Sequence, residues 1–437
     1  MADGATAPAT QYLTSVEVAG FKSAKAPVRV NFRDITVLAG ANSAGKSTVM
    51  QPLLLIKQTI EKPYDPGGLA IDGPLVRFSH ADQLLSHRRP KTAAPRFSVC
   101  VGHGDAILTL LYGKSRQAGI EVVETVFDRG DTRFTWTLDT VFHSIGDIPV
   151  IQQGWPLWLS AELLARFPHG NARVIRDRAV LVGALLPEGL VMSAPAAILS
   201  AALRNMLYLP GLRGNPERFY AVSATGAHFP GAFTDYVASV VHHWFTHDDE
   251  RHAMLEADLT LIGLASNLVT KPVDGAHIEI HVGGVSAAGR GRSKDTVNIA
   301  DVGFGVSQTL PVLVALLAAE PNQMVYIEQP ELHLHPKAQI AMADILLQAA
   351  DRGVRVVIET HSNLLLLALQ AAVAEGRIAP DRVSLNWFTR DAAGQTHVTE
   401  AQLDADGSYG DWPEDFGENE LKLQDRFMTA VERNHAR

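Results

Sequence analysis

The sequence predicts an α/β fold with a mostly parallel core sheet, an antiparallel β arm and an inserted helical subdomain. Two regions of the chain lead to this prediction. Near the N-terminus, short apolar strands run through a glycine-rich loop into a helix, and between about residues 299 and 374 helices and strands alternate. The later strands are nearly all apolar, as parallel strands covered on both faces are. Both ends of the chain are therefore expected to share one sheet, with the middle inserted between them.

The N-terminal part of the core is expected over residues 11–89, after a flexible tail at 1–10. Short β-branched or alternating stretches between turn-prone residues predict three strands, at Ser15–Phe21, Val28–Phe32 and Ile35–Ala39. Apolar residues then recur at helical spacing over Lys46–Glu61, until prolines and glycines end the pattern. The predicted order is strand, loop, helix.

The middle of the chain, residues 90–205, shows a different pattern. From about Arg96 to Asp139, alternating segments are separated by glycine turns, which indicates an antiparallel β arm. From about Pro156 to Leu207 the pattern is helical but interrupted by proline and glycine, and this stretch is the predicted helical insertion.

The C-terminal part of the core, residues 206–400, is expected to add strands and covering helices to the sheet. The predicted elements are a helix at Val306–Ala319, a strand at Met324–Glu328, a helix at Pro336–Asp351, a strand at Val354–Glu359 and a helix at Asn363–Ala374. Residues 401–437 form a tail that ends in a helix-like stretch. Its aromatic residues Trp412 and Phe416 are expected to pack on the sheet, with docking of a partner as the alternative.

Composition and charge exclude several classes of protein. With 46% hydrophobic and 19% charged residues, the chain has the composition of a globular protein. Its net charge of −9 gives no general attraction to phosphate backbones. The single cysteine, Cys100, suits a reducing compartment, and no signal-peptide pattern or membrane-length apolar stretch is present. We therefore expect a cytoplasmic protein that does not associate with membranes.

The strongest motif is GANSAGKS at Gly40–Ser47, which matches G-x-x-x-x-G-K-S between a predicted strand and a predicted helix. Glycines let backbone N–H groups close around phosphates, and a helix N-terminus favours negative charge. Lys46 is expected to reach the β and γ phosphates of ATP, and Ser47 to ligate Mg²⁺. The predicted ATP-binding residues of the loop are Gly40, Asn42, Ser43, Ala44, Gly45, Lys46, Ser47 and Thr48. A glycine turn beside a helix, without nucleotide, is the alternative.

A second motif, MVYIEQPE, places Glu328 at the end of an apolar strand, where a Walker B carboxylate would meet magnesium. A solvated strand end is the alternative for an acid in this position. A further apolar strand follows the intervening helix and ends in Thr360–Ser362, which puts His361 at the same edge of the sheet. Both strand ends are therefore expected to face the phosphates.

Three strings, GANSAGKST, IEQPELHLHP and IETHSN, together resemble the ABC-type P-loop ATPases related to the OLD (overcoming lysogenization defect), RecF and SMC proteins. The resemblance covers both ends of the chain and is weakest across roughly residues 90–200. It implies an ABC-type ATPase head that uses ATP and Mg²⁺. By this resemblance, Lys46 holds phosphates, Ser47 and Glu328 ligate the metal, and His361 is the switch histidine that senses the γ phosphate.

A glycine-containing turn at Asp301–Gln308 opens the helix upstream of the Walker B strand, where this family carries its signature motif. The turn departs in form from LSGGQ. The resemblance implies that Ser307 and Gln308 contact nucleotide held by the opposite subunit, with a packing role as the alternative. A homodimer or higher oligomer formed around ATP is therefore expected.

The residue after the Walker B acid is usually a glutamate in this family but is Gln329 here. An amide cannot accept a proton at neutral pH, so slow hydrolysis is expected. Glu331 is the alternative base, and His361 is a further candidate for polarising the water. His333 and His335 suggest a metal site with Glu331, although the resemblance favours a dimer-contacting D-loop for this stretch.

Other polar residues keep two interpretations each. Arg213 and Arg218 suit either phosphate binding or a surface salt bridge, and the salt bridge is favoured. Asp82 or Gln83 suits either the magnesium-sensing loop of such ATPases or an ordinary surface turn.

The resemblance implies three classes of function. The favoured one is an ATPase whose dimerisation controls a separate effector, a nuclease or toxin, in bacterial antiphage or antiplasmid defence. The second is a RecF-like ATPase of DNA repair or maintenance, which requires a basic groove that this acidic composition does not support. The third is a nuclease like full OLD proteins. About 60 residues follow the last predicted core helix, too few for a Toprim domain, so no intrinsic nuclease is expected.

Overall fold

The structure is a computed structural model. It describes residues 12–89, 92–93, 95–115, 119–142, 171–186, 190–192, 195–223, 226, 228–284, 295–409 and 425–429. Among these residues, no helix combines the length and the apolar character needed to cross a membrane.

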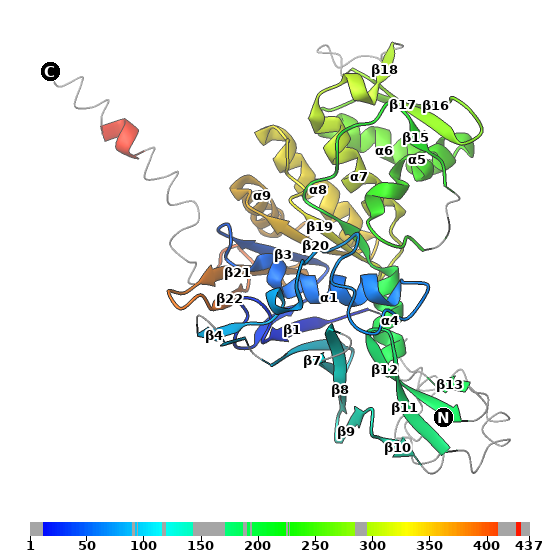
Figure 1. The fold of residues 1–437 in the computed structure, drawn as a ribbon. Coiled ribbons are helices and arrows are strands. Elements are labelled where there is room, and N and C mark those ends of the chain that lie inside the picture. Colours follow the sequence, from blue (N-terminus) through cyan, green and yellow to red (C-terminus); the bar gives the residue numbers. More distant parts are fainter. Residues whose placement is uncertain are drawn as a thin grey trace, which may run out of the picture.

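A six-stranded sheet forms the centre of the molecule and is built from both ends of the chain (Figure 1). Its order is β14 (Leu207–Leu209), β19 (Met324–Glu328), β20 (Arg355–Thr360), β3 (Ile35–Gly40), β21 (Val383–Arg390) and β22 (Thr396–Ala401). The first five strands are parallel, and β22 is antiparallel to β21. Because β3 pairs with β20 and β21, the prediction that the two ends share one mostly parallel sheet is confirmed.

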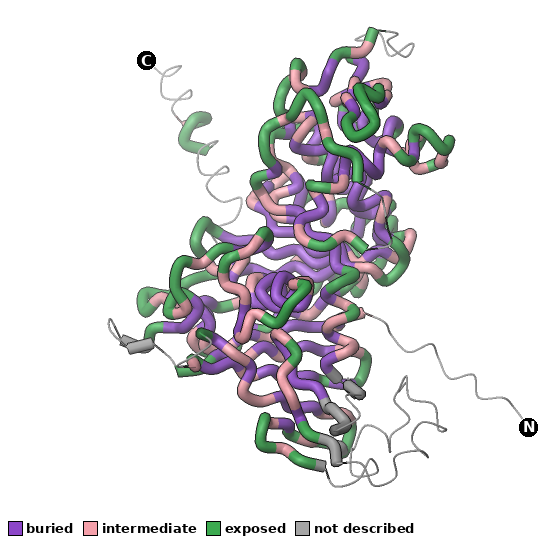
Figure 2. Tube along the Cα trace, turned by 45° about the vertical axis from the view of Figure 1, so that its right-hand side comes forward, coloured by how far each residue is buried: buried purple, intermediate pink, exposed green. Residues whose placement is uncertain are grey.

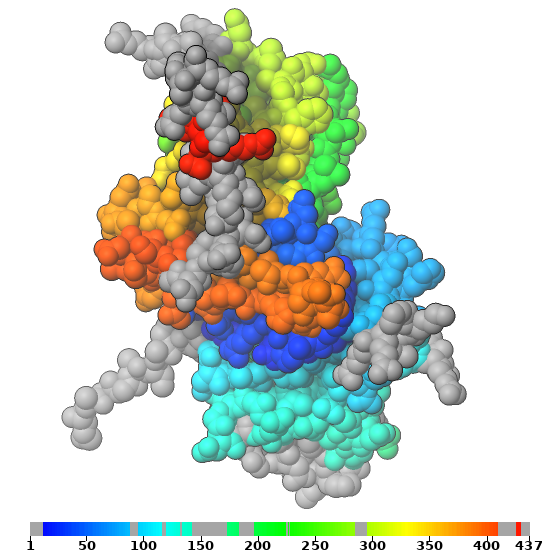
Figure 3. Space-filling view, turned by 90° about the vertical axis from the view of Figure 1, so that its left-hand side faces the viewer, coloured from blue at the N-terminus to red at the C-terminus, as the bar shows by residue number. Residues whose placement is uncertain are grey.

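One face of this sheet packs on α1 (Lys46–Ile60), which separates it from a second, antiparallel sheet (Figure 1). That sheet has the order β2 (Val28–Asn31), β1 (Ser15–Ala19), β6 (Arg96–His103), β7 (Ala106–Ser115), β8 (Gly119–Arg129) and β9 (Thr132–Thr137). Strands β6 to β9 confirm the predicted antiparallel arm. The C-terminal strands also contact the N-terminal segment, where Asn31 Nδ2 donates to Glu400 Oε2 at 2.8 Å (Figure 3).

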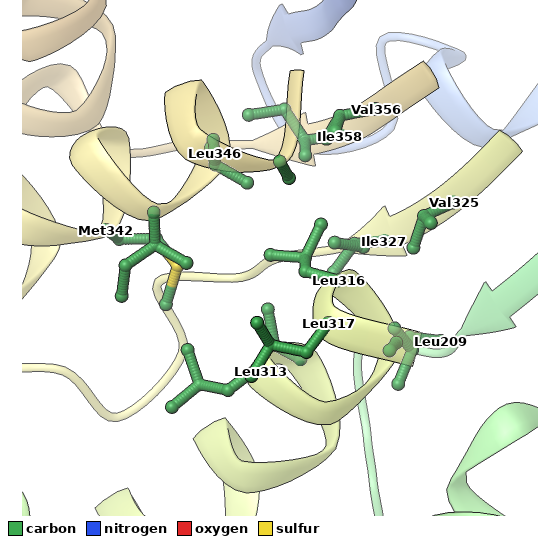
Figure 4. Packing of buried hydrophobic residues seen from close by; sticks show 14 of the residues in the cluster. Leu209, Leu313, Leu316, Leu317, Val325, Ile327, Met342, Leu346, Val356 and Ile358 are labelled. Atoms are coloured by element: carbon green, nitrogen blue, oxygen red, sulfur yellow. The ribbon is translucent and has the colours of Figure 1, made fainter. Parts of the chain in front are cut away.

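The other face is covered by α7 (Phe304–Ala318), α8 (Pro336–Asp351) and α9 (Asn363–Ala374) (Figure 1). Side chains of the core strands alternate between the two faces. Val37, Ile327 and Ile358 lie in the cluster under these helices (Figure 4), whereas Leu38 and Val357 lie in the cluster around α1. Apolar residues on both faces make the sheet a continuous buried layer (Figure 2), which explains the nearly apolar strand sequences.

A smaller group of elements packs beyond α7 (Figure 1). It contains α5 (Val237–Thr246), α6 (Glu250–Leu261), β15 (Tyr220–Ala221), β16 (Asn267–Pro272), β17 (His277–Gly283) and β18 (Thr296–Asn298). The prediction did not resolve the elements of this region. The bounds of β19, α8 and α9, in contrast, are the same as those predicted.

The helical stretch predicted over 156–207 is confirmed only at α4 (Pro195–Asn205), and over 171–192 the prediction is wrong. That part folds as β11 (Asn171–Asp177), β12 (Val180–Leu186) and β13 (Leu190–Met192), with β10 (Val141–Phe142) paired to β11. Arg178 adopts a φ of 55° in the turn between β11 and β12, and β-branched residues follow it, so hairpin pairing prevails over the helical spacing. Residues 156–170 lie outside the described part.

The remaining described elements are small. Strands β4 (His87–Arg89) and β5 (Thr92–Ala93) pair with each other as a two-stranded antiparallel sheet. In the tail, Leu403 forms a bridge with Tyr409, and residues 425–429 are helical. The predicted packing of Trp412 and Phe416 concerns residues outside the described ranges.

Candidate nucleotide site

The glycine loop joins β3 to α1 and has a backbone that requires glycine at two positions. Gly40 has a φ of 140° and Gly45 a φ of 106°. A Cβ atom at Gly40 would collide with the carbonyl oxygen of Phe388, and one at Gly45 would collide with Thr396 Oγ1. Gly45 is also the N-cap of α1 and provides no side-chain cap. The first turn of α1 is therefore open to an anion, as expected of a phosphate-binding loop.

The Lys46 side chain is folded onto the loop that precedes it. Its Nζ donates to the carbonyl oxygen of Gly40 at 2.9 Å and to that of Ala41 at 3.0 Å. Burial lowers the pKa of Lys46, while the charges of Glu359 and Glu331 act in the opposite direction. The ammonium group is thus held at the loop, where it could exchange its carbonyl partners for phosphate oxygens.

Two carboxylates lie side by side at the ends of neighbouring strands. Glu328 ends β19, and its backbone partner on β20 is Glu359. The Oε2 atom of Glu359 accepts a hydrogen bond from Ser47 Oγ at 2.9 Å, and its Oε1 atom accepts one from the buried Tyr326 hydroxyl. Burial, and then the charge of Glu328, raise the pKa of Glu359 to about 7. Glu359 was not among the residues predicted from the sequence.

Two hydrogen bonds hold the carboxylate of Glu328. Tyr208 donates its hydroxyl proton to Glu328 Oε1 at 3.0 Å, and the backbone N–H of Gly211 donates to Oε2 at 3.2 Å. The rings of Tyr208 and Tyr326 stack with centroids 5.4 Å apart. The Walker B acid is therefore fixed from the adjacent strand β14 and the turn that follows it.

The glycine loop, Glu328, Glu359 and His361 surround one cavity of about 880 Å³, which is large enough for a nucleotide. Nine of the predicted residues line it: Asn42, Ser43, Gly45, Lys46, Ser47, Thr48, Glu328, Gln329 and His361. Gln83 lines it too, whereas Asp82 pairs with Lys114 at 2.8 Å. The sequence analysis missed the basic residues Lys22, Lys25 and Arg390 on this wall. Of the other loop residues, Ala44 is buried and its carbonyl accepts from Thr396 Oγ1.

Comparison with known proteins agrees with these motifs. Residues 238–368 match the family described as "AAA domain, putative AbiEii toxin, Type IV TA system", a span that contains the signature-like turn, Glu328 and His361. A stretch of 53 residues is 40% identical to the Old nuclease of Escherichia phage P2, and covers 12% of this chain and 9% of that protein. Over residues 238–368 the chain is therefore similar to this AAA domain family.

Solved structures with a similar fold include SMC head domains. For the SmcHead bound to the C-winged helix domain of ScpA, the TM-score is 0.46 at 13% identity, over 90% of this chain and 98% of that chain. For the SMC head domain from Thermotoga maritima, the TM-score is 0.36 at 12% identity, over 90% of this chain and 100% of that chain. The third structure is an Smc head domain with an extended coiled coil, bound to the C-terminal domain of ScpA derived from Pyrococcus furiosus. Its TM-score is 0.43 at 12% identity, over 95% of this chain and 99% of that chain.

The residues after Glu328 have distinct environments. Gln329, with a φ of 49°, lines the cavity, and its backbone N–H donates to the Glu359 carbonyl at 2.7 Å. Glu331 is not among the lining residues. Its Oε1 atom accepts from the His361 backbone N–H at 2.8 Å, and its Oε2 atom is buried without a partner among the described residues. Burial, and then Lys46, lower the pKa of His361, which favours the neutral ring.

The signature-like residues do not line the cavity of their own chain. Ser307 lies in the first turn of α7, and its Oγ donates to the Phe304 carbonyl at 3.0 Å. Gln308 is 2% exposed, and its amide bonds within the chain to the backbones of Arg213 and Gly214. A contact between Gln308 and nucleotide would require these bonds to break. Ser307, which is only partly buried, remains the better placed of the two.

Neither interpretation of Arg213 offered by the sequence is right. Its side chain is buried and donates to three backbone carbonyls, those of Glu328 at 2.6 Å, Gln329 at 3.1 Å and Gln308 at 3.1 Å. Burial lowers the pKa of Arg213 to about 10. Arg213 thus ties the Walker B turn to the signature helix α7. Arg218, in contrast, forms the expected surface salt bridge, with Asp301 at 2.5 Å.

Replacing Arg213 with methionine should destabilise this protein strongly. The change keeps most of the volume but removes the guanidinium donors of three backbone carbonyl groups, of which that of Gln329 keeps the Leu332 N–H as a donor. We expect a loss of about 2–3 kcal/mol in the free energy of unfolding. Urea denaturation measures the loss. The matched control is Arg218→Met, which removes only an exposed ion pair and should change stability by less than about 1 kcal/mol. Equal effects of the two changes would contradict the role assigned to Arg213.

Proposed function

We propose that this ATPase binds ATP with Mg²⁺ in the 880 Å³ cavity, dimerises around the nucleotide, hydrolyses it slowly and thereby controls a separate effector protein in the cytoplasm. One observation carries the proposal. The phosphate loop, Glu328 and His361 line one cavity, whereas Ser307 in the signature-like turn lies outside it. A site completed by a signature turn therefore needs a second copy of the chain.

The residues at the cavity fit magnesium and a triphosphate. Lys46 would hold the β and γ phosphates, and the Ser47 hydroxyl and the Glu328 carboxylate would hold the metal. The bound nucleotide would supply a phosphoanhydride bond, and its cleavage would determine how long the dimer persists. His361 lines the same cavity as Lys46 and is near enough for their charges to interact, which supports a role for His361 as the γ-phosphate sensor.

Slow hydrolysis is proposed because the cavity-lining residue after Glu328 is an amide. Gln329 can orient a water molecule through its carbonyl oxygen, but it cannot accept the proton at neutral pH. A nucleotide-bound dimer that persists would suit a protein that signals its state to a partner rather than one that turns over ATP continuously.

The proposed partner is a nuclease or toxin encoded as a separate chain, used in bacterial defence against phages or plasmids. The family matched by residues 238–368 carries a description as a putative toxin of a toxin–antitoxin system, which supports a role of this kind. Direct nuclease activity of this chain is not part of the proposal. Metal-dependent DNA cleavage that copurifies with the wild-type protein would therefore contradict it.

We expect the ATPase to dimerise in the presence of a non-hydrolysable ATP analogue, and Ser307→Glu to prevent this. The added carboxylate would face the γ phosphate held by the other subunit, while a negative charge in the first turn of α7 favours the helix itself. Nucleotide binding by the monomer should be retained. Analytical ultracentrifugation at saturating analogue measures the dimer.

The control for this experiment is Ser266→Glu, which places the same charge at a position before β16 that is partly buried, as Ser307 is. It should dimerise like the wild type. An unchanged sedimentation coefficient of the wild type at saturating analogue would contradict the proposal that a second copy of the chain completes the nucleotide site. If Ser307→Glu dimerises normally, the signature-like turn does not lie at the interface.

A further inference from the structure

The cavity contains a second buried carboxylate to which the motifs assign no role. Glu359 is 5% exposed, lies at the carboxyl-terminal end of β20 and contributes to the cavity wall beside Glu328. It precedes His361 by two residues, so the backbone that carries the switch histidine also carries this acid. A charged group of this kind is buried only where something compensates for its lost hydration.

The two carboxylates are held in matching ways. A tyrosine hydroxyl donates to each of them, Tyr208 to Glu328 and Tyr326 to Glu359, and the two rings stack. These contacts hold the Oε1 atoms. The Oε2 atom of Glu359 is directed to Ser47, the residue expected to ligate magnesium.

The bond from Ser47 to Glu359 has a direct consequence for metal binding. A serine hydroxyl has one proton and two lone pairs, and it can offer a lone pair to a cation only when its proton is directed elsewhere. Glu359 Oε2 accepts that proton at 2.9 Å from Ser47 Oγ. The lone pairs of Ser47 are then free for a metal ion on the cavity side.

The charges at this point favour the same role. Glu328 and Glu359 are neighbours on adjacent strands, and the ammonium group of Lys46 bonds to carbonyls of the loop rather than to either carboxylate. The negative charges of two carboxylates on neighbouring residues of adjacent strands repel each other in a buried setting. A divalent cation between them relieves the repulsion, and Mg²⁺ typically binds through one or two carboxylates together with phosphates and water.

We propose that Glu359 is the second carboxylate of the magnesium site. It orients the Ser47 hydroxyl towards the metal and adds the negative charge that makes nucleotide binding depend on Mg²⁺. Glu359 is thus a positioning residue, and the inference rests on the proposed function, because it assumes that ATP and Mg²⁺ occupy this cavity.

The test compares the affinity for a fluorescent ATP analogue in excess Mg²⁺ with that in EDTA. In the wild type, Mg²⁺ should tighten binding. Glu359→Gln keeps the shape but removes the charge and leaves one acceptor oxygen for the two donors Tyr326 and Ser47. The factor by which Mg²⁺ increases the affinity should therefore fall by about 10- to 100-fold. Affinity in EDTA should stay the same or rise, because a negative charge near the phosphates is gone. Tyr326→Phe, which removes a single bond to Glu359, should give a smaller loss.

The matched control is Glu256→Gln. Glu256 is also buried, at 7% exposure, and accepts from the Leu268 backbone at 2.9 Å, far from the cavity on α6. Glu256→Gln should leave unchanged the factor by which Mg²⁺ increases the affinity for the analogue. Thermal melting without nucleotide confirms that the variants are folded.

Three results overturn the inference. In the first, Glu359→Gln retains the wild-type gain from Mg²⁺. In the second, it weakens binding equally with and without Mg²⁺, which would indicate a purely structural role. In the third, the wild type binds the analogue in neither condition, and the proposed function then fails as well.

Discussion

Lys46→Ala is expected to abolish nucleotide binding at micromolar analogue and, with it, nucleotide-dependent dimerisation. The Lys46 ammonium group is held at the loop by the carbonyl oxygens of Gly40 and Ala41, so it is positioned before a phosphate arrives. Charge-assisted hydrogen bonds contribute about 1.5–3 kcal/mol each, and the loss of two such bonds corresponds to a fall in affinity on the order of 10²-fold or more.

Equilibrium titration with a fluorescent ATP analogue gives the affinity, and ultracentrifugation gives the dimer fraction. The control is Lys337→Ala, since Lys337 occupies the first turn of another core helix, α8, and is exposed. It should bind the analogue normally, because Lys337 does not line the cavity. Wild-type affinity in Lys46→Ala would mean that the cavity around the glycine loop is not the nucleotide site.

The parts of the fold that local patterns determine were predictable from the sequence. The bounds of β19, α8 and α9 agree with the prediction, because an apolar run, a proline at a helix start and Ser362 at an N-cap are signals carried by adjacent residues. The glycine loop was predictable for the same reason. Its two essential glycines and its lysine are specified within eight positions of the chain.

Residues whose roles arise only from tertiary contacts were missed. Glu359 gains its role from the register that pairs it with Glu328, and no single stretch of sequence contains that register. A signal was present, because the dipeptide Ile-Glu ends β19 and also stands one residue before the end of β20. Arg213 was misjudged because its partners are backbone carbonyls of two other segments, and a sequence does not show which carbonyls lack a donor.

Gln329→Glu is expected to accelerate hydrolysis of bound ATP by roughly 10² to 10⁴-fold, the usual contribution of a general base. The Gln329 side chain already lines the cavity, and its backbone N–H is fixed by the Glu359 carbonyl, so a carboxylate placed there would occupy the same position. Single-turnover measurements with excess protein separate this step from product release. Dimers of the variant should also dissociate sooner after mixing with ATP.

Glu331→Gln is the comparison that decides between the two candidate bases. The structure places Glu331 outside the cavity lining, with Oε1 bonded to the His361 backbone N–H, and a glutamine at 331 still offers an acceptor for that bond. The substitution should therefore change the single-turnover rate only slightly. If Glu331→Gln instead stops hydrolysis while Gln329→Glu leaves the rate unchanged, Glu331 is the base. In that case Oε2 of Glu331, which is buried without a partner among the described residues, must turn towards the attacking water in the nucleotide-bound dimer, and the proposal of slow hydrolysis is wrong.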